Sequence, residues 1–126
     1  MKKEIYSINA PKPIGPYSQA VKNENMIFIS GQIAINQKKN EIITNNISEE
    51  TKMVMENIHN ILKECDCTFQ NIVKCSIFLS DMNLFHKVNE IYSQYFTKPF
   101  PARETVEVSK LPKNVNVEIS AIAISK

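Results

Sequence analysis

Glycine is scarce in this sequence, and tryptophan is absent. Only 2 of the 126 residues are glycine, which is too few for a flexible linker or for the glycine-rich loops that cradle phosphates. No apolar run approaches the roughly 20 residues that a membrane-spanning helix needs. We therefore expect neither a phosphate loop nor a membrane partner.

An excess of charge of one sign is also lacking. The chain has 15 Lys and Arg residues against 13 Asp and Glu residues, which gives a net charge of +2. These charges are interspersed, whereas proteins that bind nucleic acid usually concentrate basic residues on one face. The sequence gives little reason to expect a nucleic-acid partner.

Cysteine and histidine are too few and too scattered for a metal site or a nucleophile with its base. Cys65, Cys67 and Cys75 make an odd count, and no apolar leader precedes them, so we expect a reducing, cytoplasmic or organellar setting. Cys65 and Cys67 lack a second ligand pair and indicate a turn. His59 and His86 fall off the apolar helix faces, so we expect both to be solvated.

The apolar pattern predicts one α+β domain over residues 1–126, in which two helices pack on one face of a single mixed β-sheet. Asn46 followed by Glu49 resembles a capping box for the first helix. The predicted elements are an edge strand 4–8, a hairpin with strands 20–21 and 26–30 that continues to 33, a helix 47–65, a strand 72–79, a helix 80–96, and strands 101–108 and 114–124.

The last two predicted strands bring together two charged residues. If they pair as a hairpin about Leu111, Arg103 and Glu118 lie near one another across the ladder. A simple cross-strand ion pair is the common explanation for such a pattern. However, Glu118 shares its strand face with Ile122 and Ile124, so its carboxylate is expected to be partly covered and to need a partner or a function.

That strand face is too apolar to remain in water. Ile122 and Ile124, together with Phe78 on the strand 72–79, lie on the side of the sheet that the helices do not cover. Exposed apolar patches of this kind often mark an association surface. We expect self-association into a closed ring or a dimer.

Both glycines of the chain lie in its N-terminal half and mark breaks in the predicted strands. Gly15-Pro16-Tyr17 forms a corner that is explained most simply as a turn. Gly31 stands where a predicted strand ends, so it marks either a β-bulge or a place where another group approaches the backbone closely.

Several segments together resemble the Rid family, also called the YjgF-like family or the reactive intermediate deaminases. The resemblance spans nearly the whole chain, and its most specific part is Pro-Ala-Arg followed by Val-Glu-Ile. The segments that carry it are Gly15-Pro16-Tyr17-Ser18-Gln19-Ala20, Ser30-Gly31-Gln32-Ile33, Val88-Asn89-Glu90-Ile91-Tyr92, Pro101-Ala102-Arg103, Leu111-Pro112-Lys113 and Val117-Glu118-Ile119.

This resemblance implies a chorismate-mutase-like α+β fold, assembled as a homotrimer with clefts at the subunit interfaces. It implies a hydrolase that converts 2-imino acids to 2-oxo acids and ammonia, without a metal or an organic cofactor. Two other classes remain open, because some relatives are described as endoribonucleases or translation inhibitors, and a trimer that binds small ligands without catalysis would keep the same motifs.

The chemistry of such a reaction accounts for two of the matched residue types. A planar guanidinium holds a carboxylate bidentately, which is the role expected of Arg103. Glu118 would orient the attacking water and carry protons. The resemblance adds further substrate-binding residues, which are Tyr17, the backbone of Ser30 and Gly31, Asn89, and Thr105 as a lining residue and not a nucleophile.

Two positions depart from the family pattern. Glu104 follows the arginine where relatives usually have a small residue, and Ala34 replaces a usual proline. Because successive strand residues face opposite ways, Glu104 should point away from Arg103. If it pointed toward Arg103, its charge would compete with the carboxylate of the substrate.

Overall fold

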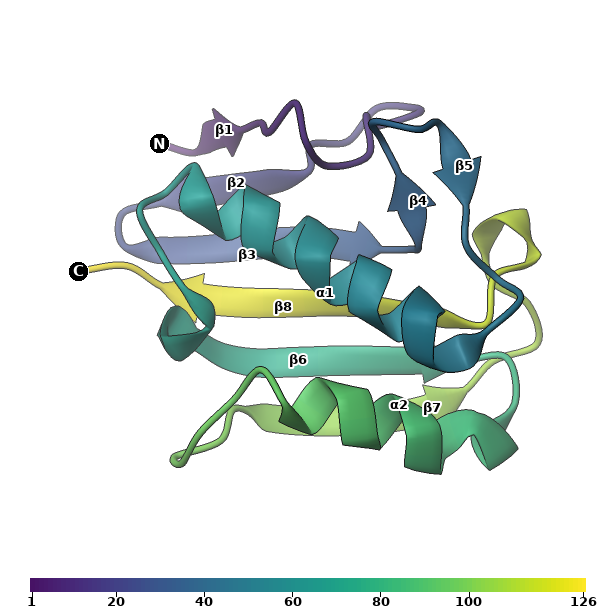
Figure 1. Ribbon diagram of the computed structural model, residues 1–126. Helices are drawn as coiled ribbons and strands as arrows, with labels where there is room; N and C mark the ends of the chain where they lie inside the picture. The colour runs from purple at the N-terminus through teal and green to yellow at the C-terminus, as the bar shows by residue number, and fades with distance from the viewer.

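Two helices cover one face of a six-stranded mixed sheet in the computed structural model, which describes residues 1–126 (Figure 1). The strand order is β1-β2-β3-β8-β6-β7, and β4 pairs with β5 in a separate ribbon. The predicted α+β architecture is confirmed. The elements are β1 (Lys3–Ile5), β2 (Ala20–Asn23), β3 (Met26–Gln32), β4 (Ile35–Asn36), β5 (Glu41–Ile42), α1 (Ile47–Lys63), β6 (Ile72–Leu79), α2 (Phe85–Ser93), β7 (Ala102–Glu107) and β8 (Val117–Ile124), with 3-10 turns at Phe69–Asn71, Met82–Leu84 and Pro112–Asn114.

Helix α1 begins at the predicted cap. The side chain of Asn46 accepts a hydrogen bond from the Glu49 backbone N–H at 3.0 Å, which satisfies one of the free N–H groups of the first turn. In a full capping box, the Glu49 carboxylate would also accept from the Asn46 backbone N–H. Here it contacts Lys52 Nζ at 3.6 Å instead. The predicted apolar face is buried, with Val54 and Ile58 both at 0% exposure.

Helix α2 is shorter than predicted. Asp81 caps a 3-10 turn by accepting from the Asn83 N–H at 2.9 Å, and the α-helix then runs only from Phe85 to Ser93. Its inward face buries Val88 and Tyr92. Neither this helix nor α1 has the length and hydropathy to cross a membrane.

Buried and outward-facing side chains alternate along β8. Val117, Ile119, Ala121 and Ala123 are at most 4% exposed and pack under the helices. The intervening side chains, which begin with Glu118, point to the outer face. Large apolar side chains remain exposed on that outer face, as the sequence predicted: Phe28, Val106 and Ile124 are 39–40% exposed, and Phe78 and Ile122 are partly buried.

The predicted hairpin between the last two strands is wrong. Strand β7 pairs in parallel with β6, and β8 lies between β3 and β6 in antiparallel pairing. A parallel pair needs a long crossover, which α2 supplies between β6 and β7. The central position lets β8 pair on both edges, while β7 becomes an edge strand of the sheet (Figure 1).

A buried glutamate fixes the beginning of β8. Glu50 of α1 is 0% exposed, and one of its oxygens, Oε2, accepts from the backbone N–H groups of Asn116 at 2.7 Å and Val117 at 3.1 Å. Its other oxygen accepts from the Asn116 amide Nδ2 at 2.8 Å. These bonds tie the helix to the strand that carries Glu118.

Replacing Glu50 with alanine should lower the free energy of unfolding by about 3 kcal/mol, because two buried N–H groups lose their acceptor. Urea unfolding of the variant measures this loss. The matched control is Glu56→Ala at an exposed position of the same helix, which should change the stability by less than about 0.5 kcal/mol. Equal stabilities of the two variants would contradict the anchoring role of Glu50.

Candidate active site

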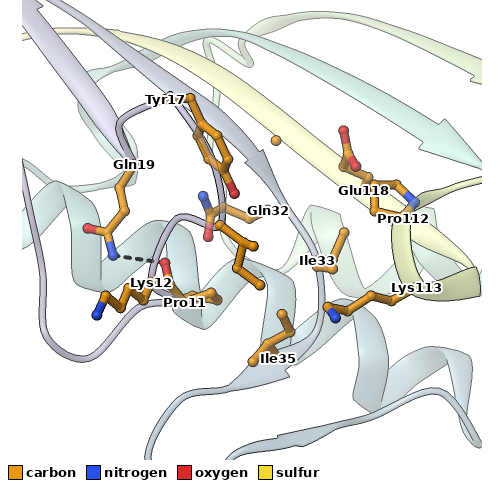
Figure 2. A pocket seen from close by; sticks show the side chains of 12 residues that line it. Pro11, Lys12, Tyr17, Gln19, Gln32, Ile33, Ile35, Pro112, Lys113 and Glu118 are labelled. Atoms are coloured by element: carbon orange, nitrogen blue, oxygen red, sulfur yellow. Dashed lines mark hydrogen bonds between the residues drawn. The ribbon is translucent and has the colours of Figure 1, made fainter.

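Glu118 borders a cavity of about 340 Å³ at the end of β3 and the beginning of β8 (Figure 2). Tyr17 and Gly31 line the same cavity, so the structure brings three of the predicted site residues together, and Gln32 lines it as well. Tyr17 is 55% exposed. The remaining lining residues are Pro11, Lys12, Ile14, Gln19, Ile33, Ile35, Pro112 and Lys113.

Gly31 provides the space for the Glu118 side chain. A Cβ atom at this position would lie 2.3 Å from Glu118 Oε2 and 2.8 Å from its Cδ, so any other residue would displace the carboxylate. The pairing of β3 with β8 also shifts register between Ile29 and Gln32, which is the irregularity of a β-bulge. Both explanations of Gly31 therefore hold, and the group that approaches closely is Glu118.

The loop that carries Tyr17 is held by a buried glutamine. Gln19 is 1% exposed; it accepts from the Ser7 N–H at 2.7 Å and donates to the carbonyls of Ser7, Ala10 and Pro11 at 2.9–3.3 Å. Sequence analysis quoted Gln19 within a motif but missed this role, because a glutamine that bonds backbone groups leaves no periodic signal.

Ser30 holds the other end of this loop. Its hydroxyl donates to the Ser18 carbonyl at 2.6 Å, and the Gln19 carbonyl accepts from the Ser30 N–H at 2.9 Å. Ser30 is not among the residues that line the cavity. The predicted contact between the Ser30 backbone and the substrate therefore stays a prediction. The Ser30 hydroxyl is already bonded within the loop.

The turn before β8 presents Pro112 and Lys113 to the cavity (Figure 2). Lys113 and Asn114 have φ angles of 56° and 57°, in the left-handed region that is costly for residues other than glycine. Consecutive residues of this kind are retained where the surroundings fix them, and they occur often at ligand sites. Here they lie beside the strand that positions Glu118.

Arg103 lies in a second cavity of about 460 Å³, on the helix side of the sheet. One guanidinium nitrogen donates to Asn89 Oδ1 at 2.7 Å. Its Cζ atom lies over the rings of Tyr92 and Phe85, at 5.0 and 5.6 Å from their centroids, within cation–π range. Sequence analysis quoted Tyr92 only within a motif and did not single out Phe85, so it missed this contact.

No acidic side chain neutralises Arg103. The ion pairs of the chain are Lys52–Glu49 and Lys74–Glu104. A guanidinium has five N–H donors, and within the chain Asn89 is the only side chain that accepts from it. The group is therefore fixed in orientation and retains donors for an anion.

Arg103 and Glu118 lie on opposite faces of the sheet, so their predicted proximity is wrong. Arg103 is the register partner of Cys75, which is buried under the helices, whereas Glu118 is opposite the outer-face residue Phe78. The cause is the parallel pairing of β7, which places Arg103 two strands away from β8.

Glu104 points away from Arg103, as predicted. It lies on the outer face, where its carboxylate contacts Lys74 Nζ at 3.0 Å and accepts a hydrogen bond from the Ser76 hydroxyl. The Ser76 bond, followed by the Lys74 contacts, lowers the pKa of Glu104. The Glu104 carboxylate is thus paired with Lys74 and Ser76, and it does not compete with a substrate carboxylate for Arg103. The other departure, Ala34, is fully buried and lines neither cavity, although its neighbours Ile33 and Ile35 line the glutamate cavity.

Thr105 occupies neither cavity. It lines a third one with Phe85 and His86, and its buried Oγ1 atom has no hydrogen-bond partner in the chain. The hydroxyl of Tyr92, beside Arg103, is also buried without a partner, and burial is the main cause that raises its pKa. Buried polar groups without partners are uncommon in folded proteins and call for an explanation.

The cysteines and histidines line neither of the two cavities. The three cysteines are free thiols, and burial is the main cause that raises the pKa of each, which keeps them protonated and unreactive. His86 is exposed as expected. His59 is instead half-buried, because its ring stacks on Phe69 with the centroids 5.9 Å apart.

Burial raises the pKa of the Glu118 carboxyl above its ordinary value. Neither ion pair of the chain involves this residue, so burial is not offset by a cation. A carboxyl group whose pKa is raised in the folded state favours the protonated form. Its stabilising effect is therefore present at low pH and is lost as the pH rises through the folded-state pKa.

Glu118→Gln should consequently stabilise the protein at pH 7, where the wild type keeps a half-buried carboxylate. The gain should vanish below about pH 4, where the wild-type group is also neutral. Urea unfolding at both pH values measures the difference, with the exposed Glu90→Gln as the control. A variant that is less stable than the wild type at pH 7 would contradict the unpaired, half-buried environment of Glu118.

Comparisons with known proteins show the family of this chain. The model of the family "Endoribonuclease L-PSP" matches residues 7–125. The chain is 50% identical over 123 residues to a RutC family protein of Pyrococcus horikoshii, covering 98% of each. It is 44% identical over 124 residues to the human 2-iminobutanoate/2-iminopropanoate deaminase, covering 98% of this chain and 90% of that protein.

A solved structure is equally similar. The crystal structure of YyfA from Yersinia pestis, a protein of the conserved Rid family whose function is described as unknown, superposes with a TM-score of 0.95 at 44% identity, covering 98% of this chain and 99% of that one. The chain therefore belongs to the Endoribonuclease L-PSP family, which is the Rid family that its motifs resemble.

Proposed function

We propose that this protein hydrolyses small 2-imino acids to 2-oxo acids and ammonia. The observation that carries the proposal is the Arg103 guanidinium, which Asn89 and two aromatic rings hold without an acidic partner. Its planar set of donors matches the two oxygens of a carboxylate. Every 2-imino acid and every 2-oxo acid carries such a carboxylate next to the reacting carbon.

Glu118 supplies the proton transfers. A protonated imine is electrophilic at carbon, so water attacks there once a carboxylate accepts one of its protons. The proton then passes to the nitrogen and the C–N bond breaks. Ammonia leaves with the bonding electrons, and the hydroxyl gives its proton to the Glu118 carboxylate as the carbonyl forms; that proton then passes to ammonia or to solvent. The raised pKa of Glu118 brings it closer to the working pH, which favours a group that must both accept and donate a proton. These steps use no metal and no organic cofactor.

The separation of Arg103 and Glu118 within one chain supports a site that a second copy completes. Arg103 is on the edge strand β7, and Glu118 is on the outer face near the centre of the sheet. We infer a chorismate-mutase-like homotrimer in which the β7 edge of one subunit meets the outer face of the next. This packing would also cover Phe28, Val106 and Ile124.

The similarity to the human deaminase supports the reaction class, while the name of the family model keeps RNA cleavage as the alternative. The direct test generates imines in situ with an amino-acid oxidase and follows their removal and the release of ammonia. RNA cleavage is measured on the same preparation with strict nuclease controls. Binding of 2-oxo acids without imine turnover would instead favour a ligand-binding trimer.

Arg103→Ala should reduce kcat/KM for the imine by about 30-fold or more, because the carboxylate loses its bidentate partner. Arg103→Lys should retain part of the activity, since lysine keeps the charge but not the planar donors. Lys87→Ala, on the exposed side of α2, serves as the control and should leave turnover unchanged. Wild-type turnover in Arg103→Ala would refute the carboxylate-binding role.

Mixing two inactive variants tests whether each site spans two subunits. Arg103→Ala and Glu118→Gln should both be inactive alone. In trimers refolded from an equal mixture, about a quarter of the interfaces would pair an intact Arg103 with an intact Glu118, so roughly that fraction of wild-type activity should return. No recovery, in a mixture shown to contain both chains in one assembly, would place the complete site within one subunit.

A further inference from the structure

Asn57 connects the middle of α1 to the segment that follows β3. The residue is 0% exposed, although its side chain is a polar amide. Its Nδ2 atom donates to the carbonyls of Ile33 and Ile35, at 3.0 Å in each case. One side chain of the helix therefore holds two points of the segment that leaves the sheet.

Between these two points the chain makes a tight turn with Ala34 at its centre. The Ile35 N–H donates to the Ile33 carbonyl at 2.8 Å, which is the hydrogen bond of a γ-turn. Ala34 is not among the residues with positive φ, so the turn is of the inverse type. The Ala34 carbonyl accepts from the Ile43 N–H at 2.9 Å. All three carbonyls of the turn are thus paired, and Asn57 is a donor to two of them.

This turn forms part of the wall of the Glu118 cavity. Ile33 and Ile35 both line the cavity (Figure 2), and both are partly buried. Their side chains therefore present apolar surface to the same space that the Glu118 carboxyl group borders. The placement of that surface depends on the turn, since the isoleucines are its first and last residues.

The fold retains the Asn57 amide at a cost. Its Oδ1 atom is buried and accepts from no group in the chain, and an unpaired buried acceptor is destabilising. Neighbouring buried positions of α1, such as Val54 and Ile58, are apolar. An apolar residue in place of Asn57 would avoid this cost, but it would also remove the two donors that hold the turn.

We propose that Asn57 is a positioning residue for the side chain of the substrate. By holding the turn, it keeps Ile33 and Ile35 as an apolar wall on which the aliphatic side chain of a 2-imino acid packs. This inference rests on the proposed function and deepens it, because such a wall selects among imino acids by the length of their side chains. An apolar pocket discriminates by about tenfold or more for each methylene that it contacts.

The test compares two imines that differ in the length of their side chains. D-amino-acid oxidase makes 2-iminopropanoate from D-alanine and 2-iminopentanoate from D-norvaline. In the wild type, kcat/KM should be at least about tenfold higher for the longer imine, because its extra methylenes contact the wall. Asn57→Ala removes both donors and should lower this ratio at least about threefold, since the isoleucines are no longer held in place.

Amide hydrogen exchange, followed by NMR, reports on the turn without any substrate. The N–H groups of Ile35 and Ile43 both donate to carbonyls of the turn, so they should exchange faster in Asn57→Ala. Adding Ala34→Pro should compensate, because proline fixes φ near the value of an inverse γ-turn and no backbone hydrogen bond uses the Ala34 N–H. The double variant should regain the substrate ratio of the wild type to within about twofold.

Thr51→Ala is the matched control. Thr51 is a buried residue of the same helix, and its hydroxyl donates to the Ile47 carbonyl within the helix at 2.8 Å. This variant should lower the melting temperature and leave the substrate ratio unchanged. If Asn57→Ala does not fold, Asn57→Leu fills the space without a donor, and the same fall in the ratio is expected.

Equal losses of kcat/KM for both imines in the Asn57 variant would make the residue purely structural and overturn this inference alone. Unchanged exchange at Ile35 and Ile43, or a wild type that does not favour the longer imine, would do the same. A wild-type protein that turns over neither imine would overturn both the inference and the proposed function.

Discussion

The parallel ladder between β6 and β7 determines what Arg103 can do. It places the arginine on an edge strand, with its side chain toward α2, where Asn89 and the rings of Tyr92 and Phe85 fix the guanidinium. The same ladder leaves the centre of the sheet to β8. Alternation along β8 then places the Glu118 side chain on the outer face. A charged pair that an ordinary hairpin would neutralise internally is instead kept apart, and both groups remain available to a ligand.

Buried polar groups divide into those that hold the framework and those that lack a partner. Glu50 and Gln19 bond backbone groups and thereby position β8 and the Tyr17 loop. Gln32 and Tyr92 each have an unpaired atom and line the glutamate and arginine cavities, respectively. Two more unpaired atoms, Asn57 Oδ1 and Thr105 Oγ1, line neither cavity, so unpaired atoms alone do not locate a ligand, and the candidate site rests on the geometry of Arg103 and Glu118.

The sequence predicted the elements and faces of this fold well, because periodicity reports burial directly. The apolar outer face at Ile124 and the outward direction of Glu104 both followed from alternation along a strand. Strand partners were predicted less well, since two adjacent strands in the sequence favour a hairpin while a crossover helix permits parallel pairing. Roles such as that of Gln19 depend on hydrogen bonds between segments that are apart in the sequence, which no local pattern records.

The pair formed by Lys74 and Glu104 has a consequence for how a second molecule can sit on the outer face. These charges interrupt an apolar surface and are still about half exposed to water. Removing both from solvent carries a desolvation cost that their mutual attraction does not always offset. A neighbouring chain is therefore expected to leave this pair hydrated. The desolvated part of any interface on this face should stop short of Lys74 and Glu104.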